Sequence, residues 1–244
     1  MQIEAMRAVK NLALVLAAAL WVMALPMVQA WAQSDQPIRV VALGDSLTAG
    51  YGLATNKAFP VQLQAALQNA GVPAIVENAG VSGDTTAGGL ARLEWSLGAE
   101  NPDLTIVALG GNDFLRGLPI GSTQSNMETI VGGLAERDVP TLVAGMLAPP
   151  SMGQDYEKTF NAIYPAVAEA NDAFLYPFFL EGVAFERALN QPDGIHPTAQ
   201  GVGIIVERML PSVINALVES GACGPAENAV CDAAAFDLAE QGRT

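Results

Sequence analysis

Short apolar runs alternate along the chain with longer stretches in which apolar residues recur at helical spacing. Five nearly continuous apolar runs are typical of strands covered on both faces: residues 38–43, 74–78, 104–109, 141–147 and 174–179. Helical spacing of apolar residues predicts helices at about 58–70, 86–97, 124–137, 155–171 and 198–219. A kink is expected near Pro211 in the last of them. This alternation predicts an α/β domain with a parallel sheet and right-handed crossover connections.

Four clusters of small and polar residues interrupt this pattern. Three directly follow predicted strands and the fourth precedes the last helix: "GDSLTAG" (44–50), "NAGVSGDT" (78–85), "GGND" (110–113) and "DGIHPT" (193–198). Ligands bind at the carboxyl ends of strands in parallel sheets, so these clusters are candidate site residues. Each also has a structural interpretation as a turn or a helix cap, and for Ser46 alone helix capping is the better explanation.

The single histidine of the chain, His196, changes this balance. Asp193 lies three residues before it, a spacing that lets the carboxylate reach Nδ1 and leaves Nε2 to take a proton from a serine. A surface histidine beside a carboxylate is the alternative. The side-chain amide of Asn112 and the backbone N–H groups of Ser46 and a glycine are donors that stabilise a tetrahedral oxyanion. Together the clusters predict nucleophilic catalysis.

The N-terminus is typical of a secretory signal peptide. Two basic residues within residues 1–10 precede a 14-residue apolar run at 12–25, and small residues follow. We expect a signal peptide over 1–32 with cleavage after Ala32, or after Ala30 as the second choice. The run is short for a membrane span, so no stable membrane anchoring is expected. The expected location is periplasmic or secreted.

The remaining chain divides into a catalytic domain at 33–219 and a polar, Ala-rich extension at 220–244. Cys223 and Cys231 are the only cysteines, and their short separation in an exported chain predicts a disulfide that pins the extension. Two sulfurs and one distant histidine do not make a metal site. The chain has 25 acidic and 11 basic residues and a formal charge of −14, which argues against nucleic acid as a partner. A monomer is the default expectation.

The motifs "GDSLTAGYG", "SGDTTAGGLARL", "LGGNDFLRGLP", "FNAIYP" and "DGIHPTAQG", in this order, resemble the SGNH (GDSL-type) hydrolases. The resemblance covers about residues 38–216 and is strongest to the bacterial periplasmic acyl-CoA thioesterase, arylesterase and lysophospholipase branch. It implies a flavodoxin-like three-layer α/β/α sandwich around a five-stranded parallel sheet. It also implies Ser46 as nucleophile, His196 as general base and acid, and Asp193 as its orienting carboxylate.

The same resemblance implies an oxyanion hole formed by the N–H groups of Ser46 and Gly83 and the amide of Asn112, with Gly80 as a competitor for Gly83. The expected reaction is hydrolysis of an ester or thioester of a small acyl substrate through an acyl-enzyme, without a metal or other cofactor. Phe114, Leu115 and Leu118 suggest an apolar acyl pocket. A carbohydrate acetylesterase and a non-catalytic periplasmic binding module on the same fold are the alternatives.

Overall fold

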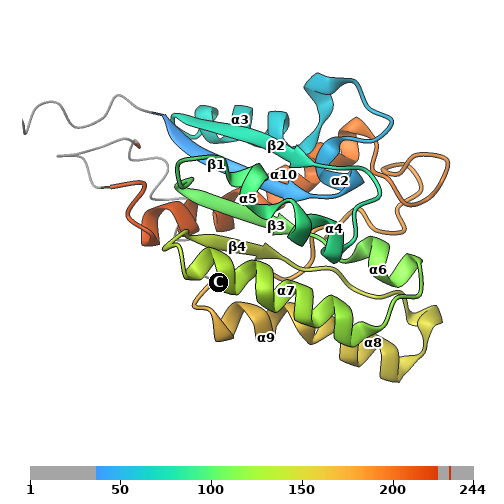
Figure 1. Ribbon diagram of the computed structural model, residues 1–244. Helices are drawn as coiled ribbons and strands as arrows, with labels where there is room; N and C mark the ends of the chain where they lie inside the picture. The colour runs from blue at the N-terminus through green and yellow to red at the C-terminus, as the bar shows by residue number, and fades with distance from the viewer. Residues whose placement is uncertain (1–36, 225–230, 232–244) are drawn as a thin grey trace, which may run out of the picture. The chain divides into compact units, whose positions relative to one another are not determined.

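Five parallel strands form one sheet, in the order β2-β1-β3-β4-β5, in the computed structural model of the protein (Figure 1). The strands are β1 (Ile38–Gly44), β2 (Ala74–Gly80), β3 (Leu104–Ala108), β4 (Thr141–Ala144) and β5 (Phe174–Tyr176). The structure describes residues 37–224 and 231, all within a compact unit that begins at Pro37. The central strands are buried along their whole length, as the apolar runs predict.

Helices cover both faces of the sheet (Figure 1). On one face, α3 (Phe59–Asn69) packs against α10 (Ala199–Glu219). The other face carries α4 (Thr86–Ala91), α5 (Leu93–Leu97), α7 (Ile120–Ala135), α8 (Gln154–Asn161) and α9 (Ile163–Ala170). The short elements α2 (Ser46–Ala49), η1 (Thr55–Lys57), α6 (Gly111–Leu115) and η2 (Pro150–Met152) lie in loops. The three-layer α/β/α sandwich is therefore confirmed.

Two predicted helices are each divided in the structure. The helix expected at 86–97 changes direction at Arg92, whose guanidinium donates to the carbonyls of Gly44 and Ala79. The helix expected at 155–171 divides at Ala162, because Pro165 has no N–H for the helical bond to the fourth residue before it.

The last helix, α10, runs through Pro211 as one continuous element. It is long and apolar enough to cross a membrane by length and composition, but half or more of that stretch is buried within the fold. Core helices of soluble proteins have the same properties, and the burial of Val202, Ile205, Met209 and Leu217 shows α10 to be part of the core. Burying one such side chain contributes about 1.5–3 kcal/mol.

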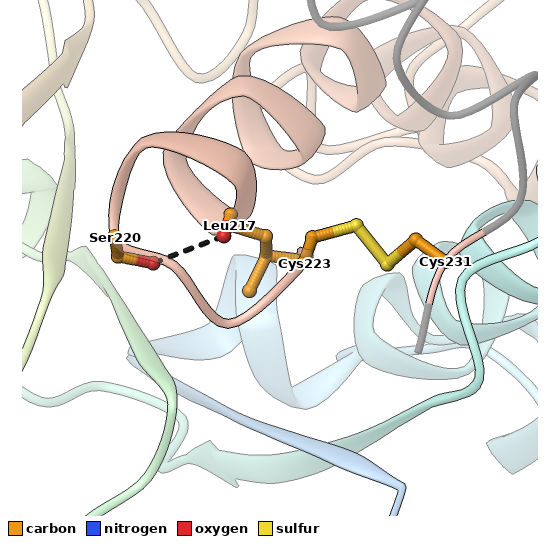
Figure 2. Close-up of a disulfide and its surroundings, with 4 residues drawn as sticks. All are labelled: Leu217, Ser220, Cys223 and Cys231. Carbon is orange, nitrogen blue, oxygen red and sulfur yellow. Dashed lines mark hydrogen bonds between the residues drawn. A yellow bond between two sulfur atoms is a disulfide. The ribbon is translucent and has the colours of Figure 1, made fainter. Parts of the chain in front are cut away.

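A disulfide follows α10 and joins Cys223 to Cys231, with their Cα atoms 5.5 Å apart (Figure 2). Both half-cystines are buried. The N–H of Cys223 donates to the carbonyl of Leu217 at 2.9 Å, and the Ser220 hydroxyl donates to the same carbonyl at 3.2 Å. The bridge therefore holds the end of the helix against the core. The expected signal peptide, residues 1–32, lies outside the described residues, as does most of the expected extension.

Candidate active site

Ser46 stands at the start of α2, directly after β1, but it does not cap the helix. The cap is Asp45, whose carboxylate accepts the N–H of Leu47 at 2.9 Å. The Ser46 hydroxyl instead lies 2.9 Å from Nε2 of His196. The short helix ends at Gly50, which has a left-handed backbone with φ of 81°. The sharp strand-to-helix turn thus presents the serine hydroxyl to the histidine.

Asp193 and His196 lie in one loop and contact each other as the sequence spacing predicts. Nδ1 of His196 is 2.7 Å from one carboxylate oxygen of Asp193. The other oxygen accepts the N–H groups of Ile195 at 2.9 Å and of His196 at 3.0 Å. The backbone N–H groups of His196 and Ile195, followed by the imidazole, lower the pKa of Asp193 to about 2. Asp193 is therefore an ionised group that fixes the orientation of the ring.

Two residues that the sequence did not single out also hold the histidine. The ring of Tyr51 lies against the imidazole of His196, with centroids 4.6 Å apart. The side-chain amide of Gln191 donates to the carbonyls of Tyr51 at 2.8 Å and Pro197 at 3.0 Å. Gly52 has a φ of 72°, which favours glycine, and a Cβ there would come within 2.3 Å of the oxygen of this amide, so a larger residue would displace Gln191. These contacts join the loop after Ser46 to the loop of His196.

Gly83 lies in the turn between β2 and α4. Its φ of 86° is in the left-handed region that favours glycine, and the guanidinium of Arg116 donates to its carbonyl. The N–H of the competing residue, Gly80, is occupied by the side chain of Asn78 at 3.0 Å. In contrast, within residues 37–224 the N–H groups of Ser46 and Gly83 donate to no protein acceptor. Gly83 thus has the accessible donor and Gly80 does not.

Asn112 lies on α6, after β3, and its side chain reaches the Ser46 turn. Nδ2 donates to the carboxylate of Asp45 at 3.1 Å and to the carbonyl of Asp84 at 2.9 Å. Asp45 is only 2% exposed, and this burial raises its pKa to about 6, against the opposing effects of the Leu47 N–H, His196 and Asn112. Asn112 therefore links the turns that carry Ser46 and Gly83.

The neighbouring Asp113 holds α6, the helix that carries Asn112, in place. Its carboxylate is buried and accepts the N–H of Thr86 at 2.9 Å, the hydroxyl of Thr86 at 2.5 Å and the hydroxyl of Thr123 at 3.2 Å. These three bonds tie α6 to the starts of α4 and α7. The sequence offered Asp113 only as part of the "GGND" cluster, because its partners lie in other segments.

A cavity of about 380 Å³ borders the His196 loop. Gly194 and Ile195, the residues between Asp193 and His196, form part of its wall. Phe114 and Leu115 line it, as expected for an acyl pocket, but Leu118 is not among the lining residues. The N–H of Leu118 donates to the carbonyl of Asp113, which closes a turn in this loop. A role of Leu118 in substrate binding stays a prediction.

Comparisons with known proteins show the family of the chain. A sequence model of the GDSL-like Lipase/Acylhydrolase family matches residues 42–204. The chain is 38% identical over 174 residues to the esterase TesA of Pseudomonas aeruginosa (71% of this chain, 87% of the relative). It is 36% identical over 186 residues to an arylesterase of Vibrio mimicus (76% and 93%). It is also 36% identical over 170 residues to thioesterase 1/protease 1/lysophospholipase L1 of Escherichia coli K12 (70% and 80%).

A solved structure supports the same assignment. The crystal structure of AlinE4, described as an SGNH-hydrolase family esterase, superposes with a TM-score of 0.64 at 45% identity. The match covers 76% of this chain and 100% of AlinE4. The chain therefore belongs to the GDSL-like lipase/acylhydrolase family and is an ester hydrolase of the SGNH type.

Proposed function

We propose that the chain is an exported serine hydrolase that cleaves ester or thioester bonds of acyl substrates. The observation that carries this proposal is the continuous chain of contacts from Ser46 Oγ through the imidazole of His196 to Asp193, with distances of 2.9 and 2.7 Å. Such an arrangement activates a serine because the imidazole takes its proton while the carboxylate stabilises the imidazolium. The proposed reaction needs no cofactor, since these side chains and water supply the nucleophile, base and acid.

In the proposed mechanism, Ser46 Oγ attacks the acyl carbonyl as His196 Nε2 takes the hydroxyl proton. The tetrahedral intermediate collapses, and the imidazolium gives this proton to the leaving alcohol or thiol. A water molecule then attacks the acyl-enzyme with His196 again acting as the base. The carboxylic acid leaves and the Ser46 hydroxyl is restored.

The proposed oxyanion hole consists of the N–H groups of Ser46 and Gly83 and the amide of Asn112. The free N–H of Gly83 and the occupied N–H of Gly80 support this choice. The amide of Asn112 donates to Asp45 and Asp84 in this structure, so it must share or exchange one of these bonds to reach an oxyanion. One donor of this kind typically changes the rate by about 10²–10³.

The cavity supports an acyl chain as the part of the substrate that is held. Its wall includes the aromatic residues Phe114, Phe178 and Phe185 and several aliphatic side chains, which suits an apolar chain better than an acetylated sugar. The relatives include an arylesterase and a protein named thioesterase 1/protease 1/lysophospholipase L1. We therefore place aryl esters, thioesters and lysophospholipids among the candidate substrates.

Export is proposed from the composition of residues 1–32, and the Cys223–Cys231 disulfide is consistent with an oxidising compartment. The expected location is the periplasm or the medium, with a mature N-terminus at Gln33 or Trp31. The N-terminal mass of the protein recovered from the periplasmic fraction tests this part separately from catalysis.

Hydrolysis of p-nitrophenyl esters by wild type and by Ser46→Ala tests the catalytic proposal. We expect the variant to lose at least about a thousandfold in kcat, as when the nucleophile is removed from other serine hydrolases. Ser125→Ala, on the exposed side of α7, is the matched control and should keep full activity. Phenyl butyrate and its S-phenyl thioester compare the two bond types. Full activity in a folded Ser46→Ala would contradict Ser46 as the nucleophile, whereas a folded wild type and a folded variant that are equally inert would favour a binding module.

A further inference from the structure

Glu157 is the one charged residue among the described residues that line the cavity. Glu157 lines the cavity, and none of the lining residues is a lysine, arginine or histidine. Its side chain is half-buried and, within the described part of the chain, has no hydrogen-bond or ion-pair partner. A carboxylate on a largely apolar wall attracts a positive charge and repels a negative one, because few other groups there screen it.

The aromatic rings of the same wall favour the same charge. Phe114, Phe178 and Phe185 contribute to the lining. The faces of aromatic rings attract ammonium groups, and aromatic cages with a nearby carboxylate are a recurring way to bind quaternary ammonium ligands. The cavity thus combines an apolar body with an acidic and aromatic surface suited to a cation.

The position of Glu157 on its helix has a simpler explanation that must be separated from this one. Glu157 and Asp155 both lie in the first turn of α8, where negative charge is favoured by the helix dipole. Asp155, however, is exposed and does not line the cavity. The two residues therefore share the effect on the helix, and only Glu157 faces the cavity.

We propose that Glu157 makes the cavity selective for acyl chains that end in a cationic group, and that it rejects chains that end in a carboxylate. The inference rests on the proposed function, because it takes the acyl chain as the part that enters the cavity. The substrate class it identifies is an ester or thioester of an ammonium-bearing acid. Glu157 acts here as a specificity-determining residue and takes no part in the bond-breaking steps.

Three p-nitrophenyl esters with the same three-carbon spacer test this proposal. Their acyl chains are 4-(trimethylammonio)butanoate, its neutral carbon isostere 5,5-dimethylhexanoate, and glutarate as the monoester. For wild type we expect kcat/KM to fall in the order cationic, neutral, anionic. In Glu157→Gln the ratio of cationic to neutral ester should fall about tenfold and the anionic ester should gain, whereas Asp155→Asn should keep the wild-type ratios.

The outcomes separate the two proposals. If Ser46 is required for hydrolysis of the neutral ester but Glu157→Gln leaves the ratios unchanged, the selectivity proposal is wrong and the proposed function stands. An equal change in Asp155→Asn would show a long-range charge effect and overturn the proposal as well. Butyrylcholine and its neutral isostere 3,3-dimethylbutyl butyrate differ in charge on the alcohol side of the ester. An effect of Glu157→Gln confined to this pair would overturn the proposal that the acyl chain occupies the cavity.

Calorimetry supplies a readout that does not need turnover. Hexyltrimethylammonium and heptanoate carry opposite charges on the same hexyl chain. We expect wild type and Asp155→Asn to bind the cation more tightly, and Glu157→Gln to lose about tenfold of that preference. Equal affinities of wild type and Glu157→Gln for the cation would overturn the proposal even if no ester were hydrolysed.

Discussion

The side-chain amide of Gln191 donates to the main-chain carbonyl of Tyr51 at 2.8 Å and thereby joins two loops 140 residues apart in the sequence. The same amide donates to the carbonyl of Pro197, and the N–H of Gln191 donates to the carbonyl of His196 at 2.7 Å. The ring of Tyr51 packs on the imidazole of His196. The position of His196 relative to Ser46 thus depends on a residue outside the proposed triad.

Replacing Gln191 with alanine should lower kcat about tenfold and leave KM within about twofold of wild type. The change removes two hydrogen bonds, each worth about 1 kcal/mol, and lets the imidazole move from the serine hydroxyl. Steady-state kinetics on p-nitrophenyl butyrate measure both constants. Gln68→Ala removes an amide that donates to the carbonyl of Ala74 and should keep wild-type kinetics. Equal kinetics in the two variants would show that Gln191 does not position His196.

Replacing Asp193 with asparagine should reduce kcat by about 10²–10⁴, because the amide does not stabilise the imidazolium and favours the wrong tautomer. Wild type should show no rate step from Asp193 between about pH 4 and 9, since its pKa lies near 2. Its contribution to stability is complete above its unfolded pKa and is lost only as pH falls toward 2. A pH-rate profile of both proteins measures the effects on the rate. A loss of less than about tenfold in the variant would contradict the proposed role.

Replacing Asp45 with asparagine should change how stability depends on pH. Burial raises the pKa of Asp45 to about 6, so the folded protein binds this proton more tightly than the unfolded chain. The contribution of Asp45 to stability therefore falls as pH rises from about 4 to about 6 and does not change further above that range. The loss attributable to Asp45 is about 3 kcal/mol, given about 1.4 kcal/mol for each pKa unit.

Urea unfolding at pH 4 and pH 7.5 measures this effect as the difference between wild type and Asp45→Asn. Asp155→Asn serves as the exposed control and should follow the wild-type pH dependence. Parallel pH dependence of wild type and Asp45→Asn would show that burial does not hold the proton on Asp45.

Phe185 is 83% exposed, has a φ of 65° and lines the cavity. A positive φ costs a non-glycine residue about 1 kcal/mol or more, so the backbone holds this ring at the cavity at some expense to stability. Phe185→Gly should preserve or raise the melting temperature and lower kcat/KM for octanoate esters about fivefold, with little effect on acetate esters. Trp95→Ala removes another exposed ring, outside the cavity lining, and should leave the chain-length profile unchanged. An unchanged profile in Phe185→Gly would exclude contact with the acyl chain.

The sheet could be predicted from the sequence because its strands are buried on both faces and read as unbroken apolar runs. The ends of strands were harder to place. The strand expected at 174–179 ends at Tyr176 because Pro177 has no N–H to offer the ladder, and the strand expected at 141–147 ends at Ala144. Gly145 lies so close to Pro177 that a Cβ would come within 2.3 Å of its carbonyl oxygen.

The residues of the proposed triad, Ser46, Asp193 and His196, could be predicted because each lies in a recognisable sequence motif. The residues that hold them were not found, for a physical reason. Asp45 reads as a helix cap, which it is, and its bond to Asn112 spans 67 residues. Gln191 likewise acts on a carbonyl far away in the sequence. Such long-range contacts leave no local pattern, whereas caps and turns do.

Covalent labelling of the purified protein with an alkyl fluorophosphonate, followed by intact-mass and peptide mass spectrometry, tests the role of Ser46 most directly. We expect one adduct per chain, located on Ser46, with no adduct in Ser46→Ala and much slower labelling in His196→Ala. A control with heat-unfolded protein should remain unlabelled. An adduct on another residue, or ester hydrolysis that persists while Ser46 is fully modified, would contradict the assignment of Ser46 as the nucleophile.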